Sequence, residues 1–504
     1  MKRWLAILLG SLAWFAACMP WGSFRDPDAF YHAKMSDLIT RSGPLHAFPW
    51  LDLTTLGASF ADQHLLLHVL VIPFQWIFGM LYGTQVAALI LGSGAVMAFY
   101  AVLRYLRIRI PELWATLFFM SPPLVMRLTL GKASPLAVTL FVVGLAAVIT
   151  SAPWLGFVAG LGFALSHGGW LLLLAGQGVL LIGQGLTKRV VFNDSWKNAT
   201  LQLPWKTIGA TWMGVVIGLV VHPNRATLAK LLWVQVVRIG IQTQFGRVFL
   251  GQEWLPAEVS GLLAITSVLL FMSGVVLMGL LFARTERVDT ARMGATIGMG
   301  SLFACMLALT FKSQRFVEYL VPTWALFLAL LAQHIDLARL RTVVTQELLR
   351  TKWAFYAVGV GLVSMIGQNS VQTFNALHTS VGGFHDDDAA VQAIQAHTRP
   401  GDRIMTSDWD EFPQLFATLD DRRYVSGLDP TFLLDANPHL SDEFRDVTLG
   451  RATSTLYTFI HDELHARAIF VTAQEHKDFD TALAHDARFT RIYTDPTIHV
   501  YQVQ

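Results

Sequence analysis

Charged residues are scarce in this 504-residue sequence, and their scarcity excludes an ordinary soluble protein. Asp, Glu, Lys and Arg make up 14% of the residues, whereas a typical soluble domain carries about 25%. Hydrophobic residues reach 54%, which is typical of a chain embedded in a bilayer. The formal net charge of +2 gives no reason to expect a nucleic-acid partner.

Cysteine and the familiar catalytic signatures are also nearly absent. Cys18 and Cys305 lie inside apolar segments and far apart in sequence, so a disulfide framework is not expected. The polar C-terminal part has no glycine-rich phosphate loop, no Cys/His metal spacing and no nucleophile elbow. The candidate functional residues are therefore the polar residues at the ends of the apolar segments.

Apolar runs long enough to cross a bilayer recur from the first residues to about residue 371. Lys2 and Arg3 precede the first run, which also fits a cleaved signal peptide, but the many later runs favour an uncleaved helix with a cytoplasmic N-terminus. The predicted spans, about eleven, are approximately 4–19, 84–103, 112–126, 134–151, 153–167, 169–185, 207–222, 259–282, 293–311, 318–334 and 353–371.

Basic residues between these spans set the predicted orientation. They form four groups, and all four lie in the cytoplasm if the apolar segment 65–82 runs along the outer surface or re-enters instead of crossing. The C-terminus is then outside, on the periplasmic side of a cell (inner) membrane. The groups are Arg104, Arg107 and Arg109; Lys188, Arg189, Lys197 and Lys206; Arg284, Arg287 and Arg292; and Arg339, Arg341, Arg350 and Lys352.

The long first external loop, 21–83, carries two clusters of acidic and histidine residues. Because proline fixes the turn after the first span, the carboxylates on either side of it are presented where the chain leaves the membrane. A simpler interpretation is that these acids cap the helix that begins near Ala29. His32 and His68 are also well explained as packed residues of surface helices. The clusters are Asp26, Pro27, Asp28 and His32 near the start of the loop, and Asp62, Gln63 and His64 before the segment 65–82.

Other predicted external segments carry cations at the ends of spans. Lys312, Arg315 and Glu318 recur at helical spacing, and an arginine there suits the phosphate of a lipid-linked substrate because it forms bidentate bonds with phosphate oxygens. An equally simple alternative is that Arg315 and Glu318 pair only to anchor the helix at the interface. Arg127 and Lys132 are interpreted as contacts to lipid head groups without a catalytic role.

After about residue 372 the charge rises and the spanning runs stop. This change predicts a membrane domain, 1–371, and a soluble domain, 372–504. Asp408, Trp409 and Asp410 follow the first expected strand and are the candidates for substrate contact in the tail, although surface acids at a helix start are the simpler explanation. Strands expected at 403–406, 423–425, 468–472, 490–494 and 497–503, with helices between them, indicate a small α/β domain.

Two of these stretches resemble a known family. Residues 26–32, DPDAFYH, directly after a first span, are similar to the first external loop of GT-C-fold glycosyltransferases, especially of oligosaccharyltransferase catalytic subunits. Residues 404–412 are similar to the tryptophan/aspartate motif that opens the soluble domain of that family, although Trp409 stands alone here. The stretch 127–134 lacks the acidic metal-binding motif of the oligosaccharyltransferases, and this absence, with the number of spans, is closer to the protein O-mannosyltransferases.

The resemblance implies a polytopic α-helical membrane protein of the GT-C kind with a C-terminal soluble α/β domain. It implies transfer of a sugar from a polyprenyl-phosphate or polyprenyl-diphosphate donor to an external acceptor, within a membrane whose lipids are also partners. A carboxylate, Asp28 or Asp26, would deprotonate or orient the acceptor. Arg315, with Lys312, would stabilise the departing phosphate.

The remaining candidate residues would bind a cation or the substrate. A divalent cation, Mg²⁺ or Mn²⁺, would have Asp26, Asp62 and Glu253 as its ligands, unless the chain acts without metal as the O-mannosyltransferases are understood to do. The candidates for binding substrate, besides Arg315 and Lys312, are Glu318, His32 and His64 in the membrane domain and Asp408, Trp409 and Asp410 in the tail.

A polytopic transporter or lipid-binding membrane protein without catalysis is the alternative from another class. Transporters usually show paired repeats and charged residues near mid-membrane. No internal repeat is evident in this sequence, and the charged residues cluster at the ends of spans, which favours the enzyme. A glycan polymerase or ligase that joins lipid-linked glycans would show the same features as an enzyme that transfers one sugar.

Overall fold

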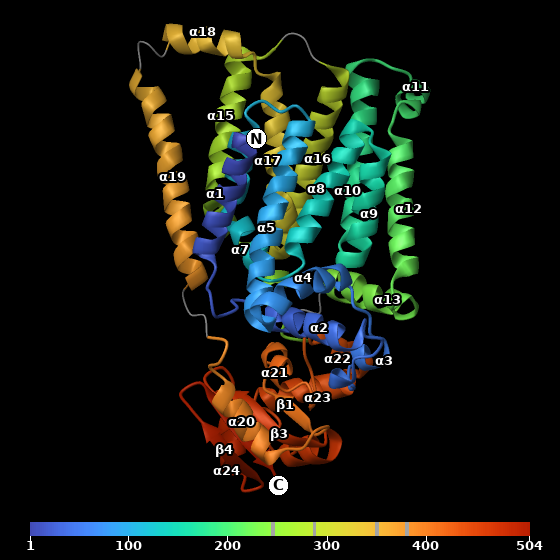
Figure 1. Cartoon of the computed structure of the whole chain (residues 1–504), viewed down its shortest axis with the longest axis vertical. Helices are drawn as coiled ribbons and strands as arrows, with labels where there is room; N and C mark the ends of the chain where they lie inside the picture. The colour runs from blue at the N-terminus through green and yellow to red at the C-terminus, as the bar shows by residue number, and fades with distance from the viewer. Residues whose placement is uncertain (243–246, 286–288, 348–351, 379–382) are drawn as a thin grey trace. The chain divides into compact units, whose positions relative to one another are not determined.

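The computed structural model describes residues 1–242, 247–285, 289–347, 352–378 and 383–504. Most of these residues are helical, and a small sheet lies near the C-terminus (Figure 1). The chain divides into two compact units, and each unit gathers segments that are distant in sequence. The first unit holds Met1–Met19, Ala87–Val220 and Glu253–Ser380, and the second holds Pro20–Val86, Val221–Gln252 and Val381–Gln504.

The first unit is a bundle of apolar helices joined by short connections. Most of them lie beside their neighbours along their length, as the ribbon in Figure 1 shows. The helices are α1 (Lys2–Cys18), most of α5 (Met80–Tyr105), α6 (Pro111–Phe119), α7 (Pro122–Thr129), α8 (Ser134–Thr150), α9 (Pro153–Ser166), α10 (Trp170–Leu186), α11 (Trp196–Leu201), α12 (Trp205–Val221), α14 (Val259–Ile265), α15 (Ser267–Ala283), α16 (Thr290–Lys312), α17 (Val317–Leu331), α18 (Leu337–Glu347) and α19 (Lys352–His378).

Within the described residues, four helices are long and apolar enough to cross a membrane alone, and up to seven spans result if each of three bent helix pairs is one span. The prediction of a polytopic helical membrane protein is confirmed, while the count of about eleven stays a prediction. Helices α4 (Leu65–Phe78) and α9 have 14 residues each. Each is thus about 21 Å long, short of the ~30 Å hydrocarbon core. Helix α9 was predicted to cross the membrane and α4 was predicted not to cross it. Their equal lengths do not distinguish these two cases.

One predicted span is broken. The segment 112–126 was expected to be continuous, but α6 ends at Phe119 and α7 begins at Pro122. Pro122 and Pro123 lack a backbone N–H and are tolerated only in the first turn of a helix, so the chain must start a new helix there. Helix α7 then meets α8 at an angle of 119°. Consecutive prolines thus convert an apolar run into two short helices.

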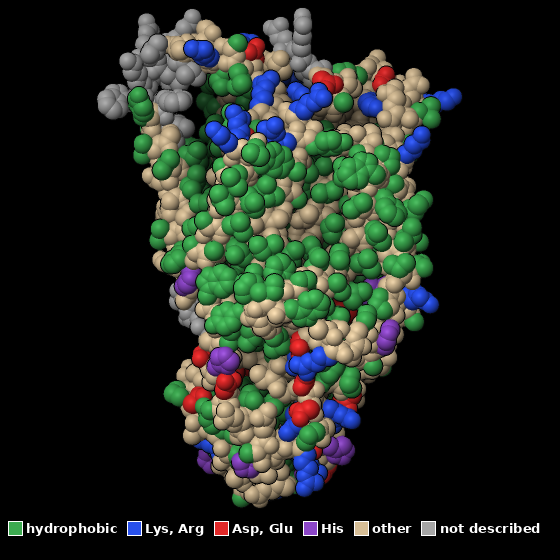
Figure 2. Space-filling view, in the orientation of Figure 1, with side chains coloured by type: hydrophobic (Ala, Val, Ile, Leu, Met, Phe, Trp, Pro, Cys, Tyr) green, Lys and Arg blue, Asp and Glu red, His purple; other side chains and the backbone are tan. Residues whose placement is uncertain are grey.

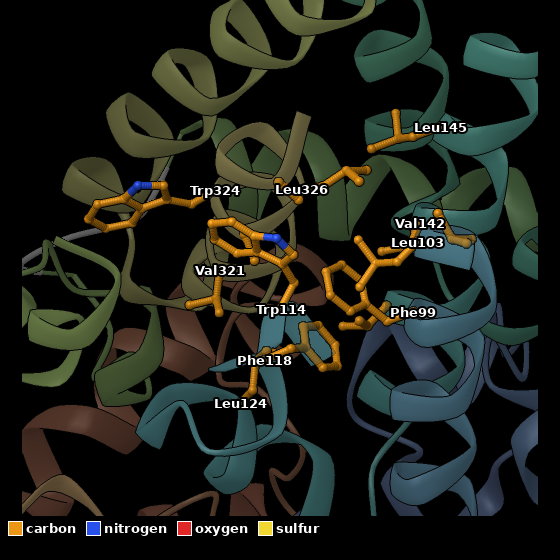
Figure 3. Packing of buried hydrophobic residues seen from close by; sticks show 14 of the residues in the cluster. Phe99, Leu103, Trp114, Phe118, Leu124, Val142, Leu145, Val321, Trp324 and Leu326 are labelled. Carbon is orange, nitrogen blue, oxygen red and sulfur yellow. The ribbon is translucent and has the colours of Figure 1, made fainter. Parts of the chain in front are cut away.

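Buried side chains from α5, α6, α7, α8 and α17 interlock in the core of the first unit (Figure 3). Phe99 and Phe118 stack with their ring centroids 4.2 Å apart. Elsewhere helices approach each other closely at glycine residues. A Cβ atom on Gly160 would lie 2.2 Å from the backbone oxygen of Thr211, so no larger residue fits there without a shift of the backbone. Helices α9 and α12 therefore pack backbone against backbone, the kind of contact that holds helices together where the hydrophobic effect is weak.

The surface of the first unit is divided by chemistry. Figure 2 shows hydrophobic side chains along the sides of the helices, with Lys and Arg gathered at the end that holds the N-terminus and α18. Such a segregation is what the positive-inside rule describes for a cytoplasmic face. The predicted orientation stays a prediction, and two of its basic residues, Arg287 and Arg350, lie outside the described residues.

The second unit joins the first external loop, the segment 221–252 and the tail. Its helices and turns before the tail are α2 (Asp28–Ser42), η1 (Pro49–Leu51), α3 (Thr55–Ala58), α4, α13 (Arg225–Leu232) and η3 (Trp233–Ile241). The tail contains α20 (Asp388–His397), β1 (Arg403–Thr406), α21 (Phe412–Thr418), β2 (Arg423–Tyr424), α22 (Thr431–Ala436), α23 (Pro438–Thr448), η7 (Thr458–Glu463), β3 (Ala466–Thr472), α24 (Lys477–His485), β4 (Phe489–Thr494) and β5 (Ile498–Val503).

The tail forms the small α/β domain that the sequence predicted. Its sheet has the strand order β2-β1-β3-β5-β4. Strands β1, β2 and β3 are parallel, and β5 and β4 run antiparallel at the other edge. Each predicted strand is found within two residues of its expected bounds, because short runs of apolar, β-branched and aromatic residues bounded by turn residues are a strong local signal.

Ion pairs tie the first external loop to the tail within the second unit. Asp52 accepts hydrogen bonds from Arg403 at 2.9 Å, and the ammonium group of Lys34 lies 2.8 Å from a carboxylate oxygen of Asp420. Asp435 of α22 in turn binds Lys230 of α13 at 2.7 Å. Contacts group the first loop with the tail in one compact unit, although the two segments are far apart along the chain. The predicted division into domains 1–371 and 372–504 stays a prediction.

Candidate functional site

A half-buried group of charges lies at the ends of helices in the first unit. Glu253 is at its centre, with one carboxylate oxygen 2.6 Å from the guanidinium of Arg127 in α7 and the other 2.7 Å from that of Arg315. Arg315 belongs to the turn η5 (Gln314–Phe316), which leads from α16 into α17. The side chains of Arg127, Glu253 and Arg315 are 12%, 24% and 32% exposed. One carboxylate therefore bridges two arginines in a largely enclosed place.

Neighbouring contacts hold this arrangement in position. The backbone of the Glu253 loop accepts a hydrogen bond from Ser313 at 2.9 Å, and the guanidinium of Arg315 stacks over the ring of Trp254 at 4.9 Å. Glu318, the second residue of α17, is buried and accepts a hydrogen bond from the Ser134 hydroxyl at 2.8 Å. The alternative interpretation paired Arg315 with Glu318 as an anchor at the membrane interface. In the structure, Arg315 forms its ion pair with Glu253 instead.

The balance of charge in this group is positive. Three cations, Arg127, Lys132 and Arg315, act on Glu253, and the only other acid among its described partners is Glu318. Burial alone would raise the pKa of Glu253, but the charges of Arg315, Lys132 and Arg127 outweigh it and hold that pKa well below its usual range. The carboxylate is thus ionised at any physiological pH, and the group keeps a net positive charge suited to an anion.

In the second unit, α2 begins with the two predicted carboxylates. Asp26 accepts the backbone N–H of Asp28 at 3.0 Å, an arrangement that starts the helix. The N-cap residue of α2 is Pro27, so Asp26 supports the first turn from the position before the cap. Asp28 is the first residue of α2 and is half-buried. The choice between Asp28 and Asp26 as the acid with a chemical role stays a prediction.

A chain of hydrogen bonds lies next to α2. His32 of α2 and His68 of α4 face each other with Nδ1 and Nε2 2.8 Å apart, and Nδ1 of His68 lies 2.7 Å from the carboxylate of Asp62. His32, His68 and Asp62 are 4%, 0% and 2% exposed. His64, half-exposed, donates its backbone N–H to the other oxygen of Asp62 at 3.0 Å. The two histidines are packed helix residues, as the simpler interpretation held, but they also form a polar network.

The predicted cation ligands do not fit a divalent metal. Glu253 already binds two guanidinium groups, and both oxygens of Asp62 accept hydrogen bonds from histidine residues. Asp26 holds the start of α2. Over the part of the chain that the structure describes, no three or more His, Cys, Asp or Glu side chains are arranged to hold a metal ion. We therefore route no chemical step through a cation.

The candidates in the tail lie between β1 and α21. Trp409 donates its indole N–H to the backbone oxygen of Phe249 at 2.9 Å, Asp408 lies 3.8 Å from His476, and Asp410 is exposed. Their neighbour Glu411 is not a surface acid. It accepts hydrogen bonds from Ser407 and Thr472, both at 2.5 Å, and so joins the carboxyl ends of β1 and β3.

The structure brings together some predicted residues and adds others. Arg315, Glu253 and Glu318 lie in one group, whereas Lys312 ends α16 with an exposed side chain. Arg127 and Ser134 are additions, and the signal for Arg127 was its place as a lone charge on an otherwise apolar segment. Asp28 and Arg315 fall in different compact units, and the roles that the resemblance implied for them in one reaction stay predictions.

Comparison with known proteins identifies the fold. No family model and no curated protein matches this sequence. The structure is similar to the apo oligosaccharyltransferase of Archaeoglobus fulgidus, with a TM-score of 0.64 and 12% identity over 99% of this chain and 74% of that one. It is similar to apo ArnT from Cupriavidus metallidurans, with a TM-score of 0.55 and 14% identity over 99% and 96%.

A third match is the arabinofuranosyltransferase AftD from Mycobacteria, with a TM-score of 0.59 and 12% identity over the whole of this chain and 40% of that one. The three matches share the architecture of GT-C membrane glycosyltransferases. The fold that the sequence resemblance implied is confirmed over nearly the whole chain.

Proposed function

We propose that this protein transfers a sugar from a polyprenyl-phosphate-linked donor to an acceptor outside the cytoplasm. The observation that carries the proposal is the pair of arginines around Glu253, set at helix ends in a fold shared with membrane glycosyltransferases. Two guanidinium groups that converge on one carboxylate are already placed to bind a planar or tetrahedral oxyanion. A lipid phosphate at the membrane boundary has that chemistry.

Positive charge is what the leaving group requires. When the bond from the anomeric carbon to the phosphate oxygen breaks, both electrons stay on that oxygen, and the new negative charge must be stabilised. Arg315 and Arg127 are fully charged at any relevant pH because guanidinium does not deprotonate in proteins. Glu253 orients both arginines, and Lys312, exposed at the end of α16, adds a positive charge three residues before Arg315.

The acceptor supplies the other half of the reaction. Its hydroxyl or amide attacks the anomeric carbon and loses a proton, which Asp28 takes as general base. Asp26 positions that acid by holding the start of α2. His32 and His64 lie close to each other, with ring centroids 5.0 Å apart, and contact the acceptor or the sugar from the same unit. Asp408, Trp409 and Asp410 bind the part of the acceptor that extends to the tail.

The first experiment identifies the donor in cells. Lipid extracts of cells without the chain are compared with extracts of the same cells complemented by the wild type or by Asp28→Asn. Accumulation of one lipid-linked sugar in the first and third extracts, and its consumption in the second, is expected. Equal lipid and glycoprotein profiles in all three would contradict the proposal and favour a transporter or lipid-binding protein. A product with repeated units would instead indicate a glycan polymerase or ligase.

The second experiment tests the anion site with a defined probe. Undecaprenyl phosphate is added to the purified full chain in nanodiscs, and the Tm is followed with the wild type and with Arg315→Ala. We expect the probe to raise the Tm of the wild type but not of Arg315→Ala, because a ligand stabilises the state that binds it. Arg488→Ala removes an exposed arginine that pairs with Asp486 in the tail and serves as the control. Equal stabilisation of all three proteins would place the phosphate elsewhere.

A further inference from the structure

The hydrogen-bonded chain in the second unit has a defined direction. Nδ1 of His68 lies 2.7 Å from a carboxylate oxygen of Asp62, which only accepts, so His68 must carry a proton on Nδ1. In neutral His68 the other nitrogen, Nε2, then carries a lone pair. Nδ1 of His32 is 2.8 Å from that lone pair and must donate to it. It follows that Nε2 of neutral His32 is a hydrogen-bond acceptor.

The same chain can take up one proton without breaking a contact. A proton that arrives at Nε2 of His32 lets the proton on Nδ1 pass to Nε2 of His68. His32 is then neutral again in its other tautomer, and His68 is an imidazolium beside the Asp62 carboxylate. No heavy atom moves, and the added charge ends next to its counter-ion, where an otherwise costly buried charge is compensated.

Helix geometry places the first residue of this hydrogen-bonded chain on the same face of α2 as the proposed general base. Asp28 and His32 are four residues apart on α2, so they lie on the same face of the helix. We propose that His32, His68 and Asp62 form a proton relay that accepts from Asp28 the proton lost by the acceptor and returns Asp28 to its carboxylate form. This inference rests on the proposed function, and it assigns a positioning role to His68 and Asp62.

In the proposed step every bond that breaks is matched by a bond that forms. The acceptor O–H or N–H bond breaks and an Asp28 O–H bond forms as the sugar is transferred. Asp28 then releases that proton to Nε2 of His32, and the Nδ1 proton of His32 moves to Nε2 of His68. The imidazolium of His68 later gives the proton back along the same path to water, and no oxidant or further reactant is needed.

The surroundings of the relay are largely apolar, with few other titratable groups. Tyr31 of α2 faces both histidine rings, at centroid distances of 5.3 Å and 6.0 Å, and His64 lies 5.0 Å from His32. His222 binds the backbone oxygen of Asp62 at 2.9 Å and not its carboxylate. Helix α21 packs against α2, with the ring of Phe416 6.3 Å from that of Tyr31. The Asp62 carboxylate keeps a lowered pKa because the charge and hydrogen bond of His68, with a further contribution from His64, outweigh the effect of burial.

The tautomers can be read without any knowledge of the substrate. The full chain, labelled with ¹⁵N-histidine in nanodiscs, is studied by NMR near neutral pH, and the signals of His32 and His68 are assigned by their loss in His32→Asn and His68→Asn. Both rings are expected to carry their proton on Nδ1. A His32 signal with the proton on Nε2 at a pH where His68 is neutral would overturn the relay, whatever the activity of the protein.

The role in turnover is read from a pH profile. The probe is the lipid-linked sugar extracted from cells that lack the chain, and transfer is measured in membranes that carry each variant. His68→Gln and Asp62→Asn are expected to lower the rate roughly ten- to hundredfold, as is usual when a supporting hydrogen-bond partner is removed. The loss should shrink as pH rises, because hydroxide and buffer then restore Asp28 without the relay.

A matched control separates this role from a structural one. His222→Gln alters another buried histidine that touches Asp62, but outside the relay. It should lower stability without changing the shape of the pH profile. A loss in His68→Gln that is the same at every pH would contradict the relay while leaving the proposed function intact. Failure of the wild type to consume the extracted lipid would overturn the proposed function itself, and the NMR result would show which of the two is wrong.

Discussion

The two compact units organise their buried polar residues in opposite ways. In the first unit, Arg127 and Arg315 enclose Glu253, and every group in the contact keeps a permanent charge. In the second unit, His32, His68 and Asp62 form a chain in which the position of a proton is variable. Fixed charge suits the binding of an anion whose charge grows during reaction. A variable proton suits a step in which a proton is released.

The difference teaches that one reaction can be divided between two environments. A departing phosphate needs charges that do not respond to pH, and only guanidinium groups provide them reliably. An acceptor that must be deprotonated near neutral pH needs groups with an intermediate proton affinity. We expect variants in the first unit to change binding and stability, and variants in the second unit to change rate and its dependence on pH.

The largest effect should come from the acid at the start of α2. Asp28→Asn keeps the size of the side chain and removes its basicity, and transfer should fall by about a hundred- to ten-thousand-fold. Consumption of the accumulated lipid-linked sugar by complemented cells is the measurement. Asp37→Asn, which changes the same charge on the same helix in a pair with Lys34 and Arg41, should have little effect. Comparable activity of the two variants would remove the acid–base role from the second unit.

The next largest effect concerns the anion site of the first unit. Arg315→Ala should weaken binding of undecaprenyl phosphate by roughly ten- to hundredfold, because a hydrogen bond to a charged group contributes about 1.5–3 kcal/mol. Arg315→Lys keeps the positive charge but lacks the planar guanidinium that forms two hydrogen bonds with a phosphate. The affinity of this variant for undecaprenyl phosphate should therefore be intermediate. Titration of the probe followed by protein fluorescence gives both values. An unchanged affinity in Arg315→Ala would contradict the assignment of anion binding to the first unit.

A smaller effect on stability should distinguish the carboxylate of the first unit. Glu253 has a folded pKa below its unfolded value of about 4.3. Its contribution to stability is therefore present above that pH and is lost as pH falls below it. Glu253→Gln should unfold several degrees earlier than the wild type at pH 7, and the difference should persist to about pH 4.3 and shrink only as the pH falls below that value. A difference that already disappears between pH 7 and pH 5, or one that does not shrink at all below pH 4, would show that the carboxylate is not stabilised by the arginines.

The smallest effect should come from the buried carboxyl of the second unit, and with the opposite sign. Burial raises the pKa of Glu411, although hydrogen bonds from Ser407 and Thr472 oppose it. A raised pKa means that stability is lost as pH rises through it. Glu411→Gln imitates the protonated form, so at pH 8 its Tm should exceed that of the wild type by about 1–3 °C. A lower Tm at pH 8 would show that Glu411 is needed as the ion.

Local signals in the sequence predicted much of this structure. Apolar runs predicted most of the helices of the first unit, and short runs of apolar, β-branched and aromatic residues predicted all five strands of the tail. The break at Pro122 and Pro123 was missed because hydropathy outweighed the proline signal in that segment. Arg315 was predicted as part of a cationic site, but its pairing with Glu253 across 62 residues was not. Arg127 was taken for a head-group contact, since a lone charge at a helix end has no partner that periodicity can reveal.

The sequence by itself determined that this is a multi-span helical protein with a small α/β tail, because hydrophobic length and period are local properties of a chain. Residues 26–32 and 404–412 also carried the likeness to a fold that the structure confirms. Only the tertiary structure decided which charges meet. Partners such as Glu253 with Arg127, or His32 with His68, are joined by loops whose closure depends on the packing of whole helices. That packing is a global property, so no local pattern encodes the pairs.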